Sequence, residues 1–187
     1  MSEPYFSEQT FESHSIPIRG EYDRCFFKGL NFSDQDLSSY SFNECTFHDC
    51  NFSMAKLINT AFRDVKFKGC KLMGLRFEDC NPFGLSFLFE DCTLNHASFF
   101  QVKMRKTVFK NSSLMEVDFS EADLAESIFH DCPLSMAVFN RTNLEKCDFR
   151  TAFGYSIDPE TNRLKNARFS TSGISGLLDK YNLIIED

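Results

Sequence analysis

The fold is decided by residues 99–149, which read FFQVKMRKTVFKNSSLMEVDFSEADLAESIFHDCPLSMAVFNRTNLEKCDF. Every fifth residue is large and apolar, and the residue two positions before each of them is small or β-branched. The large residues are Phe99, Met104, Phe109, Leu114, Phe119, Leu124, Phe129, Leu134, Phe139, Leu144 and Phe149. A helix repeats near 3.6 residues and a strand near 2, so neither keeps such residues on one buried line. The chain must bend at regular intervals, and its units must stack to bury their apolar residues.

The five-residue unit is clearest at Ala122, Asp123, Leu124, Ala125 and Glu126. This unit resembles that of the pentapeptide-repeat proteins. The resemblance implies an all-β fold, a right-handed quadrilateral β-helix in which four units form one square coil. Residues twenty apart should then form columns. The expected columns are Phe89, Phe109, Phe129 and Phe149; Leu94, Leu114 and Leu134; Phe99, Phe119 and Phe139; and Met104, Leu124 and Leu144.

A shift in the phase of the repeat divides the chain. Residues 21–82 form a first repeat block and residues 89–153 a second, with two extra residues between them. Pro82 and Gly84 interrupt the pattern, because proline cannot donate to a strand ladder and glycine relaxes the backbone. Residues 83–88 are therefore expected to be a junction whose apolar residues either plug the joint or bind a ligand. Residues 1–20 are expected to be an N-terminal cap or arm.

Residues 154–187 are predicted to cap the other end of the rod. Ser170 or Thr171 can cap a short helix, and a strand is expected at Leu183, Ile184 and Ile185. The helix is predicted to carry one apolar face made of Ile174, Leu177, Leu178 and Tyr181. These apolar residues exceed what one cap needs, and in relatives this element often pairs two rods. We therefore expect a homodimer formed through the C-terminal segment.

Composition narrows the chemistry. The chain has 187 residues, eight cysteines and a net charge of −7. Each cysteine occupies the small-residue position of the repeat, so we expect buried free thiols, although Cys25 and Cys45, or Cys50 and Cys70, would be near enough to bridge if oxidised. No signal peptide or membrane span is expected, and a cytoplasmic protein is the default.

We expect no enzyme, no cofactor and no metal site. His14, His48, His96 and His130 are scattered and lack partners at ligand spacing, and no phosphate loop or nucleophile motif is present. A convex rod also lacks the cleft in which catalytic pKa values are tuned. The negative net charge disfavours direct binding of nucleic acid.

One run of the sequence is acidic. Between Asn111 and Asn140 there is no Lys or Arg, and the acids are Glu116, Asp118, Glu121, Asp123, Glu126 and Asp131. These carboxylates either keep the rod soluble or mimic DNA phosphates toward a protein partner. The stretch from Ile157 to Arg163, continued through Leu177 and Leu178, together with the break near Pro82, resembles the quinolone-resistance and microcin or albicidin immunity branch of the family. This resemblance implies DNA gyrase or topoisomerase IV as that partner. In contrast, residues 21–82 are almost neutral.

A second surface candidate is apolar. Leu88, Val108 and Ile128 directly precede three of the central phenylalanines, so they should form an outward stripe. Either the N-terminal arm, with Phe6 and Phe11, covers this stripe, or the stripe docks a partner. The second interpretation would make the protein an interaction scaffold for a partner unrelated to topoisomerases.

Overall fold

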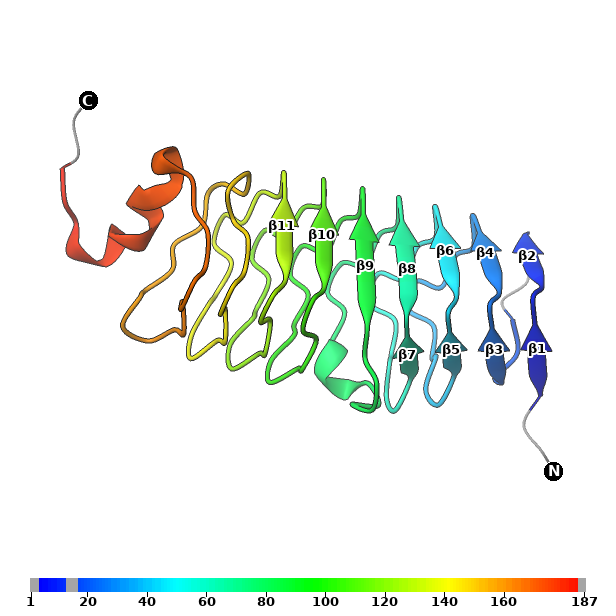
Figure 1. Ribbon diagram of the computed structural model, residues 1–187. Helices are drawn as coiled ribbons and strands as arrows, with labels where there is room; N and C mark the ends of the chain where they lie inside the picture. The colour runs from blue at the N-terminus through cyan, green and yellow to red at the C-terminus, as the bar shows by residue number, and fades with distance from the viewer. Residues whose placement is uncertain (1–3, 13–16, 185–187) are drawn as a thin grey trace.

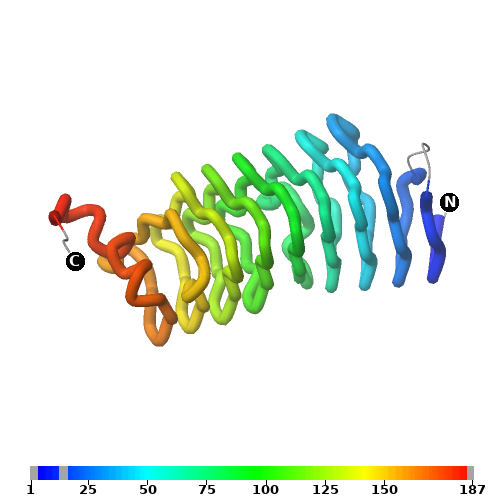
Figure 2. The backbone as a smooth tube through the Cα atoms, turned by 90° about the horizontal axis from the view of Figure 1, so that it is seen from above, coloured from blue at the N-terminus to red at the C-terminus, as the bar shows by residue number. Residues whose placement is uncertain are grey.

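The computed structural model describes residues 4–12 and 17–184, and it is a rod of stacked coils with the two ends of the chain at opposite ends (Figures 1 and 2). Two parallel sheets cover adjacent faces, in the strand orders β1-β3-β5-β7 and β11-β10-β9-β8-β6-β4-β2. The strands are β1 (Tyr5–Ser7), β2 (Thr10–Glu12), β3 (Glu21–Asp23), β4 (Phe26–Lys28), β5 (Ser41–Asn43), β6 (Thr46–His48), β7 (Ala61–Arg63), β8 (Val65–Lys68), β9 (Phe87–Glu90), β10 (Val108–Lys110) and β11 (Ile128–His130).

The strand register confirms the predicted β-helix. Val108 pairs with Ile128 and Phe109 with Phe129, so each residue lies over the one twenty positions later. The predicted columns follow from this register. The rings of Phe89 and Phe109 stack with centroids 5.1 Å apart, and those of Phe109 and Phe129 stack at 5.0 Å. The same column continues in both directions, from Phe11 through Phe27, Phe47 and Phe67 to Phe149 and Phe169.

The regular bends are tight turns. At most corners the residue two positions after a central residue has a positive φ, as at Glu116 (57°) and Glu121 (59°). Many of these corners are closed by a backbone hydrogen bond, such as that from the N–H of Ala122 to the carbonyl of Phe119 at 3.1 Å. This is the geometry of a type II turn, which disfavours bulky residues at the positive-φ position. The positive φ is tolerated at these corners because the corner side chains point outward, while the central residues pack inside the rod.

The N-terminal segment extends the solenoid. β1 pairs with β3 and β2 with β4, and the ring of Phe6 stacks on Tyr22 at 4.9 Å. Phe6 and Phe11 thus lie at the end of the core. The expectation that they cover the stripe of Leu88, Val108 and Ile128 is therefore wrong, because the same ring-on-ring packing that builds the columns holds them elsewhere.

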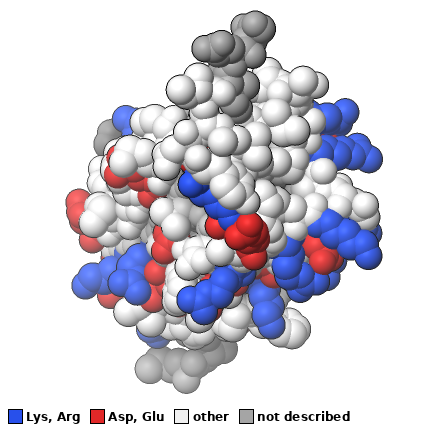
Figure 3. Space-filling view, turned by 90° about the vertical axis from the view of Figure 1, so that its left-hand side faces the viewer, with Lys and Arg blue, Asp and Glu red and all other residues white. Residues whose placement is uncertain are grey.

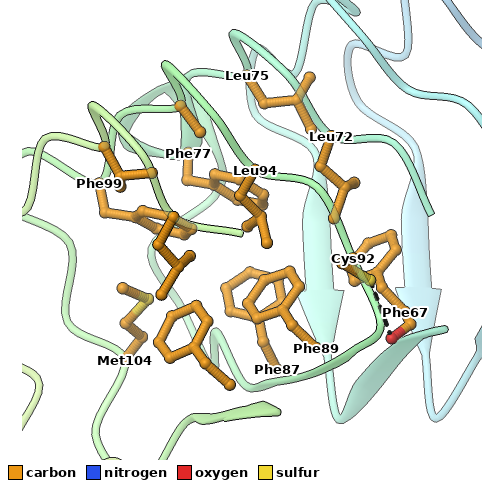
Figure 4. Close-up of a cluster of buried hydrophobic side chains, with 14 of the residues drawn as sticks. Phe67, Leu72, Leu75, Phe77, Phe87, Phe89, Cys92, Leu94, Phe99 and Met104 are labelled. Atoms are coloured by element: carbon orange, nitrogen blue, oxygen red, sulfur yellow. Dashed lines mark hydrogen bonds between the residues drawn. The ribbon is translucent and has the colours of Figure 1, made fainter. Parts of the chain in front are cut away.

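The junction absorbs its two extra residues on one face of the rod. Phe67 pairs directly with Phe89, so the phenylalanine column passes the insertion unbroken. Phe87 fills the small-residue position beside Phe89 and is buried (Figure 4), and Leu85 packs against the core. Phe83 does not plug the joint, because it is 77% exposed, with the guanidinium of Arg63 5.8 Å from its ring centre. The apolar junction residues thus divide between core and surface.

The C-terminal cap is helical but differs in detail from the prediction. It contains the 3-10 helices η2 (Thr171–Leu177) and η3 (Asp179–Tyr181), and Ser170 caps η2 by accepting a hydrogen bond from the N–H of Gly173. Leu177 packs on the core, whereas Ile174 and Tyr181 are about half exposed, so the predicted helix residues do not form one buried face. The strand prediction is wrong for Leu183 and Ile184, which pair with no strand; Ile185 lies outside the described residues.

All eight cysteines are buried free thiols. The thiol of Cys45, for example, donates to the carbonyl of Tyr22 in the preceding coil at 3.4 Å. The remaining short helix, η1 (Phe77–Asp79), precedes the junction. Within the described residues no helix is long and apolar enough to cross a membrane.

Candidate interaction surfaces

The six predicted carboxylates form a belt around the rod instead of one face. Glu116, Glu121, Glu126 and Asp131 occupy successive corners of one coil, each with a positive φ. Four corners complete the coil, so these four side chains point in four directions. A run of adjacent residues on a solenoid is spread around its circumference, which is why the structure does not bring the acids together on one side.

Neighbouring coils partly neutralise the belt. Arg105 lies 3.2 Å from Glu126, and Arg141 lies 3.7 Å from Glu121. Two histidines also contact the belt: His96 lies 3.3 Å from Glu116, and His130, inside the acidic run, lies 3.0 Å from its chain neighbour Asp131. The two arginines are absent from the acidic run and lie about twenty positions from the glutamates that they contact. Figure 3, which looks onto the C-terminal end, likewise shows basic and acidic side chains intermixed.

Two acids of the belt, Asp118 and Asp123, accept hydrogen bonds from backbone N–H groups of the coil. The carboxylate of Asp118 accepts the backbone N–H of Ser120 at 2.8 Å, which closes a local turn. Asp123 accepts the backbone N–H of Ala125 at 3.2 Å and the side-chain amide of Asn143 at 2.7 Å. Charge-assisted hydrogen bonds of this kind stabilise the coil. The glutamates are therefore better candidates for contacting a partner than the two aspartates.

The apolar stripe is present and open. Leu88 pairs with Val108 and Val108 with Ile128, so the three side chains lie in line on the outer side of the larger sheet. Ile128 is 40% exposed, and the other two are half-buried. Lys66 and Asp148 continue the line on either side. The stripe is thus a short apolar strip with charged ends.

Sequence reasoning missed a second apolar surface, made of methionines. Met54, Met73, Met115 and Met136 are all exposed, by 37 to 76%. Each follows a central residue of the same column by one or two positions, so all four lie on one face of the rod. The signal that would have found them is a recurrence near twenty residues outside the core positions. Flexible thioethers suit adaptable protein contacts.

The junction adds a cavity of about 450 Å³ beside Cys80, Leu85 and Val102. Glu78 lines it, and burial raises the pKa of this carboxyl. One of its oxygens, Oε2, is buried and has no hydrogen-bond partner. His14 lies outside the described residues. Among the residues described, no group of three or more His, Cys, Asp or Glu could hold a metal ion.

This geometry agrees with the sequence comparison. Residues 21–99 and 85–149 match the family model described as a pentapeptide repeat region. The chain belongs to the pentapeptide repeat family. No curated protein sequence matches it. Pentapeptide repeat proteins are generally non-enzymatic scaffolds, which fits a rod whose exposed features are surfaces.

Solved pentapeptide repeat structures share the fold. A trypsin-treated variant of QnrB1, described as a plasmid-mediated fluoroquinolone resistance protein, is 17% identical with a TM-score of 0.50, over 100% of both chains. HetL, a pentapeptide repeat protein involved in heterocyst differentiation regulation from the cyanobacterium Nostoc sp. strain PCC 7120, is 15% identical with a TM-score of 0.44. That match covers 90% of this chain and 86% of HetL. At such identities the QnrB1 likeness shows the fold alone.

Proposed function

We propose that this protein is a non-enzymatic, cytoplasmic binding protein that occupies the DNA-binding surface of DNA gyrase or topoisomerase IV and protects the enzyme from a quinolone or a peptide toxin. The observation that carries the proposal is the belt of carboxylates at successive corners of the rod. Corner carboxylates at successive positions follow a path around the rod, as phosphates do around DNA. The full-length fold likeness to QnrB1 adds support.

The position of the belt restricts the proposed contact with the enzyme to a short part of the rod. Residues 111–140 contain no Lys or Arg, so the enzyme would be engaged at the belt, with the junction at 83–88 as a further contact. A charge-driven contact weakens steeply as ionic strength rises, because the Debye length shortens. Protection should therefore be lost between roughly 0.05 and 0.3 M salt.

The test is gyrase supercoiling with purified protein, with and without a fluoroquinolone or a peptide toxin of gyrase. Restored supercoiling in the poisoned reaction is expected for the native protein and should be lost in Glu126→Lys. The matched control is Glu44→Lys, because Glu44 is exposed at the same corner line of the rod but outside the belt. Equal loss in both variants, or no protection at any concentration, would refute the proposal.

A second function, a scaffold for an unrelated partner, is favoured by the open apolar stripe. Replacing Val108 and Ile128 with Ser should abolish binding to such a partner while the thermal midpoint stays within about 2 °C, because neither side chain is part of the core. Binding through the stripe should also persist at high salt. A large loss of stability in the double variant would show that the stripe supports the fold instead.

We also propose that the protein forms a homodimer through its C-terminal caps. Ile174 and Tyr181 are each 52% exposed, Leu183 is 58% exposed and Ile184 is 89% exposed, which leaves an apolar end on a single chain. Sedimentation equilibrium should give twice the chain mass, and Ile184→Lys should give monomers. Monomeric behaviour of the native protein at micromolar concentration would exclude the dimer without affecting the gyrase test.

A further inference from the structure

The backbone ladder of the rod is interrupted at one place. On the face that carries Met104, the N–H of Asp123 donates to the carbonyl of Val102 at 2.9 Å, and the N–H of Met104 donates to the carbonyl of Asp123 at 3.0 Å. Equivalent bonds join the coils elsewhere on this face. In the part of the chain that the structure describes, however, no hydrogen bond joins residues 80–86 to residues 102–106.

The inserted residues cause the interruption. The N–H of Asn81 donates to the carbonyl of Thr60 at 2.9 Å, and that of Ser86 donates to the carbonyl of Phe62 at 3.3 Å, so the junction is tied to the coil before it. Toward the next coil, Pro82 stands at the repeat position whose N–H would bond the carbonyl of Lys103. Proline has no N–H to donate. Figure 1 shows the loop and the helical turn of η1 beside one end of β9.

Both backbone groups of Lys103 are consequently left without a partner on this side. Its N–H and its carbonyl form no hydrogen bond to any residue described, and they border the 450 Å³ cavity. The cavity is lined by Leu85 and Val102, with Phe100 at its edge. A donor and an acceptor on one residue, next to an apolar cavity of this size, is the arrangement by which an exposed strand edge takes up an extended peptide.

The charges around the cavity indicate in which orientation a peptide would bind. At one end Glu78 and Asp79 share a single cation, Arg76, at 3.4 and 3.2 Å, and Oε2 of Glu78 has no partner. At the other end Lys103 forms no ion pair with any described residue. A peptide that lies parallel to Lys103 would meet the acidic end first. It would therefore favour a basic residue near its N-terminus and an acidic residue opposite Lys103.

We propose that this groove binds an extended peptide segment of a protein partner. The segment takes the place of the missing ladder strand: one of its carbonyls accepts the N–H of Lys103, one of its N–H groups donates to the carbonyl of Lys103, and an aliphatic side chain enters the cavity between Leu85 and Val102. The inference rests on the interrupted ladder and not on the proposed gyrase contact, so the two can fail separately.

The probe is the synthetic peptide acetyl-Lys-Lys-Ala-Asp-Leu-Ser-amide, which copies the repeat unit and adds the two basic residues. Amide hydrogen exchange by NMR on the full-length protein is the readout. In the free protein the amide of Lys103 should exchange at least about 100-fold faster than that of Asp123, which is hydrogen-bonded. Saturating probe should slow the exchange at Lys103 at least about tenfold and leave Asp123 unchanged.

Two controls keep the test specific. The same peptide with an N-methylated leucine lacks the N–H that would bond Lys103 and should not bind. Lys103→Glu should weaken the probe about tenfold, and replacing the peptide's aspartate with lysine should restore binding to this variant. Exchange at Lys103 as slow as at Asp123 in the free protein would overturn the proposal. Absence of protection at 5 mM probe, or equal binding of the N-methylated peptide, would do so too.

Discussion

The clearest quantitative expectation concerns the phenylalanine column, and Phe109 is the residue to change. Its side chain is fully buried, and it stacks on Phe89 at 5.1 Å and on Phe129 at 5.0 Å. Truncating it to Ala removes both stacks and the edge contacts to the adjacent column. Large-to-small changes of a buried phenylalanine cost about 3–5 kcal/mol. Because the column is continuous and cannot collapse, we expect about 4 kcal/mol for Phe109→Ala.

Two further variants test why the buried ring stabilises the rod. One distinguishes the loss of side-chain volume from the loss of ring stacking, and the other compares a ring at the end of the column with one in its interior. Phe109→Leu keeps most of the volume, and leucine fills other columns of this rod, so we expect a loss of only about 1–2 kcal/mol. Phe169 is only partly buried and stacks in its column on one ring, Phe149, at 5.2 Å. Phe169→Ala should therefore cost about half as much as Phe109→Ala.

Urea unfolding followed by far-UV circular dichroism measures these differences, because the chain has no tryptophan to report by fluorescence. The exposed Phe83 provides the control, and Phe83→Ser should change the free energy of unfolding by less than about 0.5 kcal/mol. The column argument fails if Phe109→Leu is as damaging as Phe109→Ala. It also fails if the variants at Phe109 and Phe169 lose equal stability, because the neighbours on both sides of a ring would then not matter.

Three other results are expected. Burial raises the pKa of the Cys132 thiol to about 11, so a thiol reagent at pH 8 should label it only after urea unfolding. A hydrogen bond from Lys180 lowers the pKa of Asp158 below 3.8, so the cap should loosen as the pH falls through that lower value, and Lys180→Met should abolish this pH dependence in a proteolysis assay. Ser170→Ala removes the cap bond from the Gly173 N–H and should speed proteolytic cleavage of residues 171–184 about fivefold, as expected for a loss of about 1 kcal/mol.

Much of the fold could be predicted from the sequence because the period of five is imposed by packing. Phe109 and Phe129 must stack if the chain bends every five residues, and they do. The ends and the junction were harder, because fewer neighbours constrain them. Phe6 looked detached from the repeat, yet it stacks on Tyr22. Leu183 belongs to an apolar run typical of a strand, but it lies beyond the last coil, where it has no strand to pair with.

The surface was the least predictable part, for a geometric reason. On a solenoid, residues that share a face are twenty apart in sequence, whereas residues five apart face different directions. The acidic run at 111–140 therefore became a belt, and its nearest cations, Arg105 and Arg141, lie outside the run. The apolar stripe was predicted correctly because Leu88, Val108 and Ile128 are twenty residues apart and therefore lie on one face. In such proteins a continuous surface is formed by outward residues about twenty positions apart, in successive coils. A partner that binds through charge would therefore have to contact several coils along one face, or follow the carboxylates of one coil around the rod.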